Sequence, residues 1–131
     1  MPYKTEYKDD LGGVITTYWG VVTDEDLHRS GYEKYSNLEK LKSFLYALTD
    51  LSKVDKFKVS SDGIRENARI SSEILDINKK MIVVFVLPTK FQYGMGRMWQ
   101  AYAGDNGDRS HIFESRIEAD KWIDEKLNGQ F

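Results

Sequence analysis

Apolar residues form continuous runs in some segments and recur at three- to four-residue spacing in others, which predicts strands interleaved with helices. Val14–Val22 is rich in β-branched and aromatic residues, and Met81–Leu87 is wholly apolar, as expected of a strand covered on both faces. Ile64, Ala68 and Leu75 recur at helical spacing. The predicted strands are Tyr3–Lys8, Val14–Val22, Phe44–Leu51, Met81–Leu87 and His111–Phe113. The predicted helices are Asp24–Tyr35, one beginning at Ser60 or Ser61, Thr89–Ala103, and one following Ser115.

The resulting order is β-β-α-β-α-β-α-β-α, which predicts an α/β fold with one mixed sheet. After an initial hairpin, alternating strands and helices form parallel pairs joined by crossover helices. No linker, repeat or low-complexity stretch divides the 131 residues, so we expect a single domain, 1–131. Ligands of such sheets favour the carboxyl ends of the strands, which here carry 50–61, 88–97 and 114–115.

Composition narrows the classes of function. The chain has no cysteine, which excludes thiol catalysis and thiolate metal sites. Its 21 acids, 19 bases and net charge of -2 argue against a nucleic-acid partner. The apolar runs are far shorter than the ~20 residues that span a bilayer, and no secretory signal is visible, so we expect a cytoplasmic protein without a membrane span. His28 and His111 lie on separate elements, so we expect no metal, no cofactor and no catalytic residue.

Ser60-Ser61-Asp62-Gly63 precedes a predicted helix and allows two interpretations. Either serine can cap the helix by accepting a hydrogen bond from a backbone N–H group. Either can also be a phosphoacceptor, because a phosphate is stabilised at the positive end of a helix. Both interpretations can hold together.

Tyr93-Gly94-Met95-Gly96-Arg97 is the most unusual local chemistry, because each glycine inside a helix costs about 1 kcal/mol relative to alanine. A close approach of another group would explain the glycines by packing. Alternatively, helix N–H groups and Arg97 would hold an anion, with Tyr93 and Trp99 as walls of the pocket.

Three segments, in this order and spacing, resemble the SpoIIAA-like proteins of the STAS superfamily, a group of small bacterial regulators. They are similar above all to an uncharacterised branch that is also described as Sec14-like. The segments are Leu48–Val54 followed by Phe57 and Val59–Ile64; Gln92–Met98; and His111–Ser115 followed by Ala119–Ile123.

The resemblance implies a STAS-like sheet of four or five strands with helices mainly on one side. Well-studied members bind a partner protein and are switched by phosphorylation of a serine that caps a helix, a place taken here by Ser61 or Ser60. The usual preceding aspartate is absent, because Lys58 and Val59 stand there, so the switch motif is degenerate.

Two hypotheses of function follow. The first is a non-enzymatic regulatory or interaction domain that binds a partner protein, as anti-sigma-factor antagonists of the superfamily do. The alternative is a domain that binds a small anionic or amphipathic ligand with Tyr93, Gly94, Gly96, Arg97 and Trp99. The predicted edge strand Tyr3–Lys8 could also pair two copies in a homodimer, although its lysines disfavour uncontrolled pairing.

Overall fold

The strands form one mixed sheet in the order β1-β2-β3-β4-β5, as the computed structural model shows for residues 1–128, of which all side chains except that of Asp9 are described. The strands are β1 (Tyr3–Lys8), β2 (Gly13–Thr23), β3 (Tyr46–Lys58), β4 (Ile82–Val86) and β5 (Ser110–Phe113). The helices are α1 (Asp24–Lys34), α2 (Leu38–Ser43), α3 (Ser61–Ile77), α4 (Lys90–Tyr102) and α5 (Arg116–Asn128), with 3-10 helices η1 (Asp9–Leu11) and η2 (Gly104–Arg109). Positions 129–131 of the predicted domain lie outside the described residues.

The first two strands form an antiparallel hairpin, and each later strand joins in parallel. Tyr3 of β1 lies opposite Tyr18 of β2, and Lys8 lies opposite Gly13. The pairs β2–β3, β3–β4 and β4–β5 are parallel because helices connect their strands. The predicted mixed sheet is therefore confirmed, and the starts of α3 and α4 lie at the same end of the sheet.

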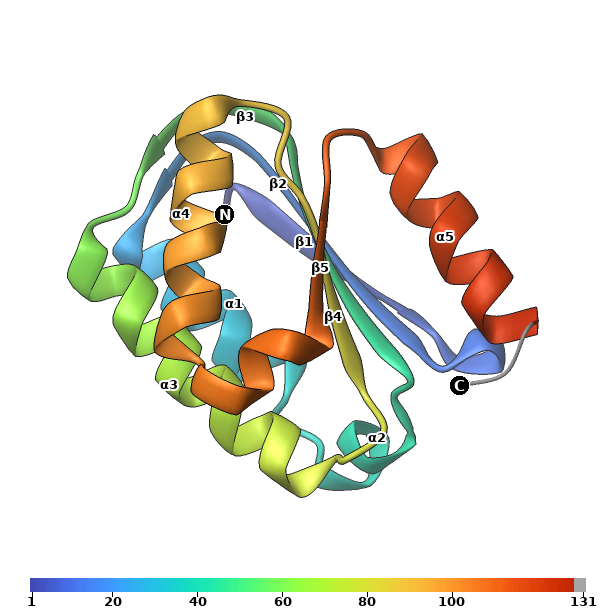
Figure 1. Ribbon diagram of the computed structural model, residues 1–131. Coiled ribbons are helices and arrows are strands. Elements are labelled where there is room, and N and C mark those ends of the chain that lie inside the picture. The colour runs from blue at the N-terminus through green and yellow to red at the C-terminus, as the bar shows by residue number, and fades with distance from the viewer. Residues whose placement is uncertain (129–131) are drawn as a thin grey trace.

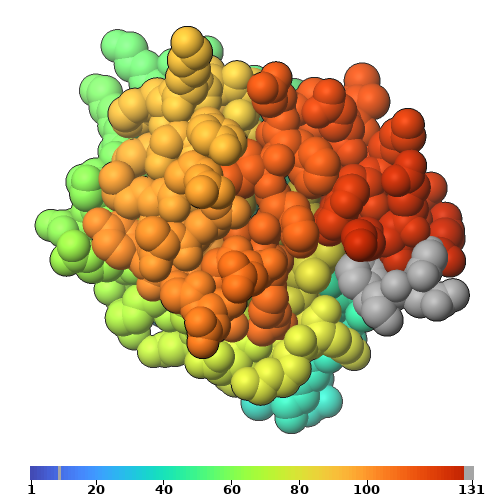
Figure 2. All heavy atoms as spheres, viewed as in Figure 1, coloured from blue at the N-terminus to red at the C-terminus, as the bar shows by residue number. Residues whose placement is uncertain are grey.

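The helices cover the two faces of the sheet unequally, which confirms the expectation of helices mainly on one side. α1, α3 and α4 lie on one face and α5 lies on the other (Figure 1). Side chains fill the space that separates the ribbons of α4 and α5 (Figure 2). In β4, Val83 and Phe85 enter the larger core under three helices, whereas Val84 and Val86 enter the smaller core under α5. This two-sided burial is the reason for the continuous apolar run in that strand.

The strand predicted at Phe44–Leu51 is longer, because β3 continues to Lys58. The neighbouring strand β2 pairs with this extension up to the pair Thr23 and Lys58. Val54 and Phe57 pack against the larger core, while the polar residues around them are exposed. The polar residues give this segment the pattern of a loop, and its pairing with β2 makes it a strand.

A short helix, α2, lies between the predicted helix Asp24–Tyr35 and the predicted strand Phe44–Leu51, where no helix is predicted. Asn37 caps it, because the Asn37 Oδ1 atom accepts a hydrogen bond of 3.0 Å from the backbone N–H of Lys40. Leu41 is buried in the larger core. This single apolar anchor is too short a pattern to predict a helix by period.

Candidate functional site

Ser60 joins the starts of two helices. The Ser60 Oγ atom accepts a hydrogen bond of 3.0 Å from the backbone N–H of Gly63, which confirms the predicted cap of α3. The same hydroxyl donates to Asp24 Oδ2 at 2.6 Å, and the Ser60 N–H donates to Asp24 Oδ1 at 2.8 Å. Because Asp24 is the first residue of α1, the start of α1 and the start of α3 are fixed to each other.

Glycine is required at position 63 by this arrangement. A Cβ atom on Gly63 would lie 2.1 Å from Asp24 Oδ1, which is far inside van der Waals contact. The carboxylate that holds Ser60 therefore also explains the glycine of the Ser60–Gly63 segment.

Ser61 differs from its neighbour because its hydroxyl has no hydrogen-bond partner among the described residues. Its side chain is exposed, and it occupies the first position of the 17-residue helix α3. Backbone N–H groups of a first helical turn lack partners inside the helix, so they attract negative charge. Of the two predicted phosphoacceptors, Ser61 is the one whose hydroxyl is available.

The two glycines of α4 have different surroundings. A Cβ atom on Gly96 would lie 2.4 Å from Leu87 Cδ1 and 3.2 Å from Ile112 Cδ1, so the helix closely approaches β5 and the residue that follows β4. Gly94 is exposed and has no atom within 4 Å of the same position. Packing therefore accounts for Gly96 and gives no reason for Gly94.

The other predicted ligand residues of α4 lie on two sides of the helix. Tyr93 and Arg97 are exposed, and Arg97 Nη1 donates to Gln100 Oε1 at 3.0 Å. Trp99 is buried on the side that faces the sheet. The structure does not bring the five predicted residues together, and ligand binding at the outer surface of α4 stays a prediction. Tyr93 does line a surface hollow of about 370 Å³ with Leu87, Pro88, Thr89, Lys90 and Glu114.

Trp99 organises the interior between α3 and α4. Its ring packs edge-on against Phe85, with ring centroids 4.9 Å apart. Its indole N–H donates to the Asn67 Oδ1 atom at 2.9 Å. Because an indole N–H can only donate, this bond fixes the orientation of the amide and leaves the Nδ2 group of Asn67 as a donor for other partners.

Two adjoining cavities, each of about 40 Å³, lie between the sheet and these helices. We name them the apolar cavity and the lysine cavity. Both are lined by Leu27, Thr49, Asn67, Phe85 and Trp99. The apolar cavity is completed by Leu51, Phe57, Ile64, Leu87, Gln92, Met95 and Gly96. The lysine cavity is completed by Tyr18, Gly31, Lys34, Tyr35, Ala47, Ile70, Ser71 and Val83.

Lys34 is a buried cation that the sequence analysis missed. It is 9% exposed, and among the described residues it has neither an ion pair nor a side-chain hydrogen bond. Its Nζ atom lies 5.3 Å from the centre of the Tyr35 ring. Burial lowers the pKa of Lys34 to about 8. A signal was present, because Leu27, Gly31 and Lys34 follow the helical spacing of an inward face.

Asp50 and Arg116 form a second polar feature that the sequence pattern did not indicate. Asp50 is buried in β3 and accepts a hydrogen bond of 2.8 Å from the backbone N–H of Ser52. Arg116, the first residue of α5, donates to Asp50 and, from its Nε atom, to Asp120 at 2.9 Å. The interaction fixes α5 to the sheet.

Among the side chains that the structure describes, those of 1–8 and 10–128, no group of three or more histidine, cysteine, aspartate or glutamate residues is placed to hold a metal ion. His28 contacts the backbone oxygen of Gly63 at 3.3 Å, and the His111 ring packs on Trp122. In the same part of the chain, no helix combines the length and apolar character needed to cross a membrane.

Comparisons with known proteins identify the fold. No protein-family model and no curated protein sequence matches the chain significantly. An uncharacterised protein of the DUF3478 family from Shewanella loihica, with a SpoIIAA-like fold, is 18% identical over 92% of this chain and 91% of its own, with a TM-score of 0.59. The unphosphorylated anti-sigma factor antagonist SpoIIAA gives a TM-score of 0.66 at 8% identity over 98% of this chain and 99% of its own.

The phosphorylated form of SpoIIAA, a cell fate determinant of Bacillus, gives a TM-score of 0.57. Its identity is 10%, over 92% of this chain and 98% of its own. The likeness covers nearly the whole of each chain, and at these identities it concerns the fold. The protein therefore has the SpoIIAA-like (STAS) fold.

Proposed function

We propose that this protein is a non-enzymatic regulatory domain that binds a partner protein through the surface around the start of α3. We call this the α3 surface and define it by Lys58, Ser60, Ser61, Asp62 and Arg65. The observation that carries the proposal is the state of Ser61, whose hydroxyl is exposed and without a hydrogen-bond partner in the described chain. Its neighbour Ser60, in contrast, is held by hydrogen bonds to Asp24 of α1 and to the backbone N–H of Gly63.

Phosphorylation of Ser61 would change the charge of this surface strongly. A phosphate adds a charge of about -1.5 to -2 at neutral pH. Its negative charge would be stabilised by the start of α3, while the carboxylates of Asp24 and Asp62 already lie nearby. The modification would therefore add negative charge to a surface on which Lys58 and Arg65 lie beside Asp62, and it would weaken binding of a partner with acidic groups at the interface.

Ser60 is less suited to modification. Its hydroxyl already donates to Asp24 and accepts from Gly63, so a phosphate there would break the cap and face a carboxylate at contact distance. The solved forms of SpoIIAA support the general idea, because that anti-sigma factor antagonist has this fold and occurs both unphosphorylated and phosphorylated.

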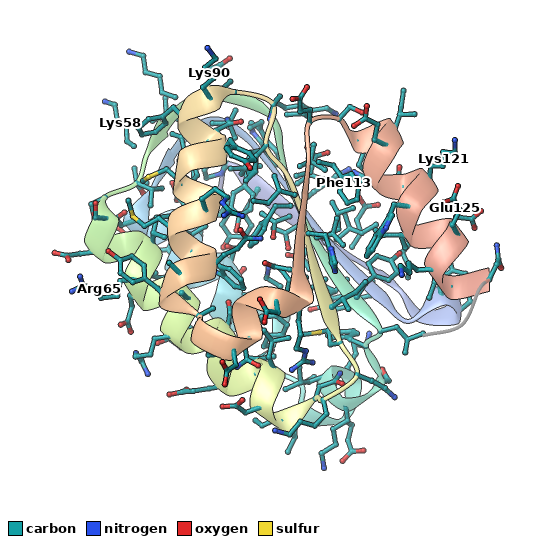
Figure 3. All side chains as sticks on the ribbon, viewed as in Figure 1. Lys58, Arg65, Lys90, Phe113, Lys121 and Glu125 are labelled. Atoms are coloured by element: carbon teal, nitrogen blue, oxygen red, sulfur yellow. The ribbon has the colours of Figure 1, made fainter. Side chains whose placement is uncertain are left out.

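Site-specific photo-crosslinking in the source cells tests the proposal. Arg65 lies on α3, and Glu125 lies on α5 at the other side of the molecule (Figure 3). A photoreactive residue at position 65 should capture a defined protein that one at position 125 does not capture. Ser61→Asp should reduce that capture, and Ser61→Ala should retain it.

The intact mass of the protein purified from the same cells completes the test. An increment of phosphate size that disappears in Ser61→Ala, but persists in Ser60→Ala, assigns the modification to Ser61. Equal capture from positions 65 and 125, or capture unaffected by Ser61→Asp, would contradict the proposal.

A further inference from the structure

The lysine cavity holds hydrogen-bond donors and no acid. Lys34 supplies an ammonium group, and the amide of Asn67 supplies its Nδ2 donor because Trp99 occupies Oδ1. Hydroxyl groups of Thr49 and Ser71 also belong to the lining, and no hydrogen bond of these two side chains is formed with the described residues. None of the residues around the cavity is an aspartate or glutamate.

This inventory is complementary to an anion. Buried charged groups are normally paired, because an unpaired charge away from water is costly. The nearest compensation for Lys34 is the Tyr35 ring at 5.3 Å, which is weaker than an ion pair. A carboxylate in the cavity would pair with the ammonium group and accept from the neighbouring amide and hydroxyl donors.

The adjoining apolar cavity indicates the rest of the ligand. Its own lining is almost entirely hydrocarbon and aromatic, with Leu51, Phe57 and Met95 among the residues. It meets the lysine cavity at the pair formed by Asn67 and Trp99. Each cavity has about 40 Å³, and a water molecule needs roughly 10–15 Å³. The space admits a few non-hydrogen atoms and excludes a nucleotide or a long-chain lipid.

Gly31 keeps this space open. It lies inside α1, where glycine is unfavourable, and a Cβ atom at this position would meet only Asn67 Nδ2, at 3.9 Å. No close approach therefore requires a glycine. Its absent side chain leaves room between α1 and the donor amide.

We propose that the two cavities form one binding site for a small monocarboxylate. The carboxylate pairs with Lys34 and with the Asn67 amide, and a short alkyl group lies in the apolar cavity. This site lies in the interior and is separate from the α3 surface, so the proposal stands or fails independently of partner binding.

Titration with sodium propionate, followed by NMR through the Trp99 indole N–H resonance, tests the proposal. That resonance is assigned with a Trp99→Phe variant. Propionate should shift it in a saturable manner. Propionamide has the same shape without the charge, and its affinity should be lower by about tenfold or more.

Three variants separate the site from nonspecific effects. Lys34→Met keeps the length of the side chain without its charge and should weaken propionate binding by about tenfold or more. Gly31→Leu keeps Lys34 but fills the cavity and should also weaken binding. Lys80→Met, at an exposed lysine, should bind as the wild type does. The amide spectrum of each variant verifies folding.

Two results would overturn the proposal. One is the absence of a saturable shift in the folded wild type. The other is binding that is equally tight in Lys34→Met or equally tight for propionamide.

Discussion

Asp50 and Arg116 form an ion pair at the edge of the smaller core, with Arg116 Nη1 3.2 Å from Asp50 Oδ2 although the residues are 66 positions apart. The carboxylate is 4% exposed and the guanidinium 33% exposed. The pair thus connects β3 with the first turn of α5. A charge buried to this degree depends on its partner, which gives the contact an energetic consequence that can be measured.

Arg116→Met should lower the free energy of unfolding by roughly 2 kcal/mol, because Asp50 would remain buried without its counter-ion. Urea unfolding measures the loss. The double variant Asp50→Asn, Arg116→Met should regain part of it. Asp120→Asn, which removes the exposed partner, should cost less than about 0.5 kcal/mol. Equal losses in Arg116→Met and Asp120→Asn would contradict the importance of the buried contact.

Ser60→Ala and Ser61→Ala should differ in stability although the residues are adjacent. Ser60→Ala removes the cap of α3 and the bonds to Asp24, so it should lower the free energy of unfolding by about 1–2 kcal/mol. Ser61→Ala removes a hydroxyl without a partner among the described residues and should change it by less than about 0.5 kcal/mol. Thermal or urea unfolding of the two variants measures this difference. A larger loss of stability in Ser61→Ala than in Ser60→Ala would refute the role of Ser60 as the cap.

Gly94→Ala and Gly96→Ala separate helix propensity from packing. Both changes should gain up to about 1 kcal/mol from propensity. Gly94→Ala adds a methyl group in open space and should keep that gain. At Gly96 the methyl group would meet Leu87 at 2.4 Å, so Gly96→Ala should be less stable than Gly94→Ala by roughly 1–3 kcal/mol. Equal stabilities in urea unfolding would remove the packing explanation of Gly96.

The stability of the protein should rise with pH above about 8 because of Lys34. Burial lowers the pKa of this lysine from 10.5 to about 8. Between these values the unfolded chain holds a proton that the folded protein has released, so the free energy of unfolding increases with pH. The complete rise is about 3 kcal/mol.

Unfolding of the wild type and of Lys34→Met between about pH 7 and 10 measures this effect. The variant should be more stable than the wild type near neutral pH, and the difference should shrink as pH rises. At higher pH, burial raises the pKa of Tyr3 to about 12, which lowers stability in both proteins equally. Parallel pH profiles of the two proteins would show that Lys34 is not a buried cation.

The order of elements and the mixed sheet could be predicted from the sequence because they depend on the pattern of apolar and polar residues within each segment. Met81–Leu87 shows the pattern of a doubly buried strand, and the hairpin partners show β-branched alternation. The end of β3 could not be predicted in this way. Val54 and Phe57 are separated by exposed polar residues, and only pairing with β2 makes the segment a strand.

The candidate sites were predictable only in part. The cap at Ser60 follows from local chemistry, since a serine directly before a helix commonly accepts a hydrogen bond from a backbone N–H of the first helical turn. The pair of Asp50 with Arg116 depends on a contact between distant segments, which leaves no local pattern. The helical spacing of Leu27, Gly31 and Lys34 places Lys34 on an inward face, but the cavity around it is formed by residues from distant segments. The five predicted ligand residues of α4 form a local motif, but the rotation of the helix sends Gly96 and Trp99 inward and Tyr93 and Arg97 outward.

The unequal covering of the sheet has a consequence for motion. The smaller core is covered by α5 alone, whereas the larger core is covered by helices that also contact one another. Opening of α5 therefore exposes Leu48 and Val84 but leaves the three-helix layer and its cavities closed. Amide protons of α5 should exchange by this local opening, at a lower free energy than those of α3, which exchange with global unfolding. We therefore expect the two faces of one sheet to open as separate cooperative units.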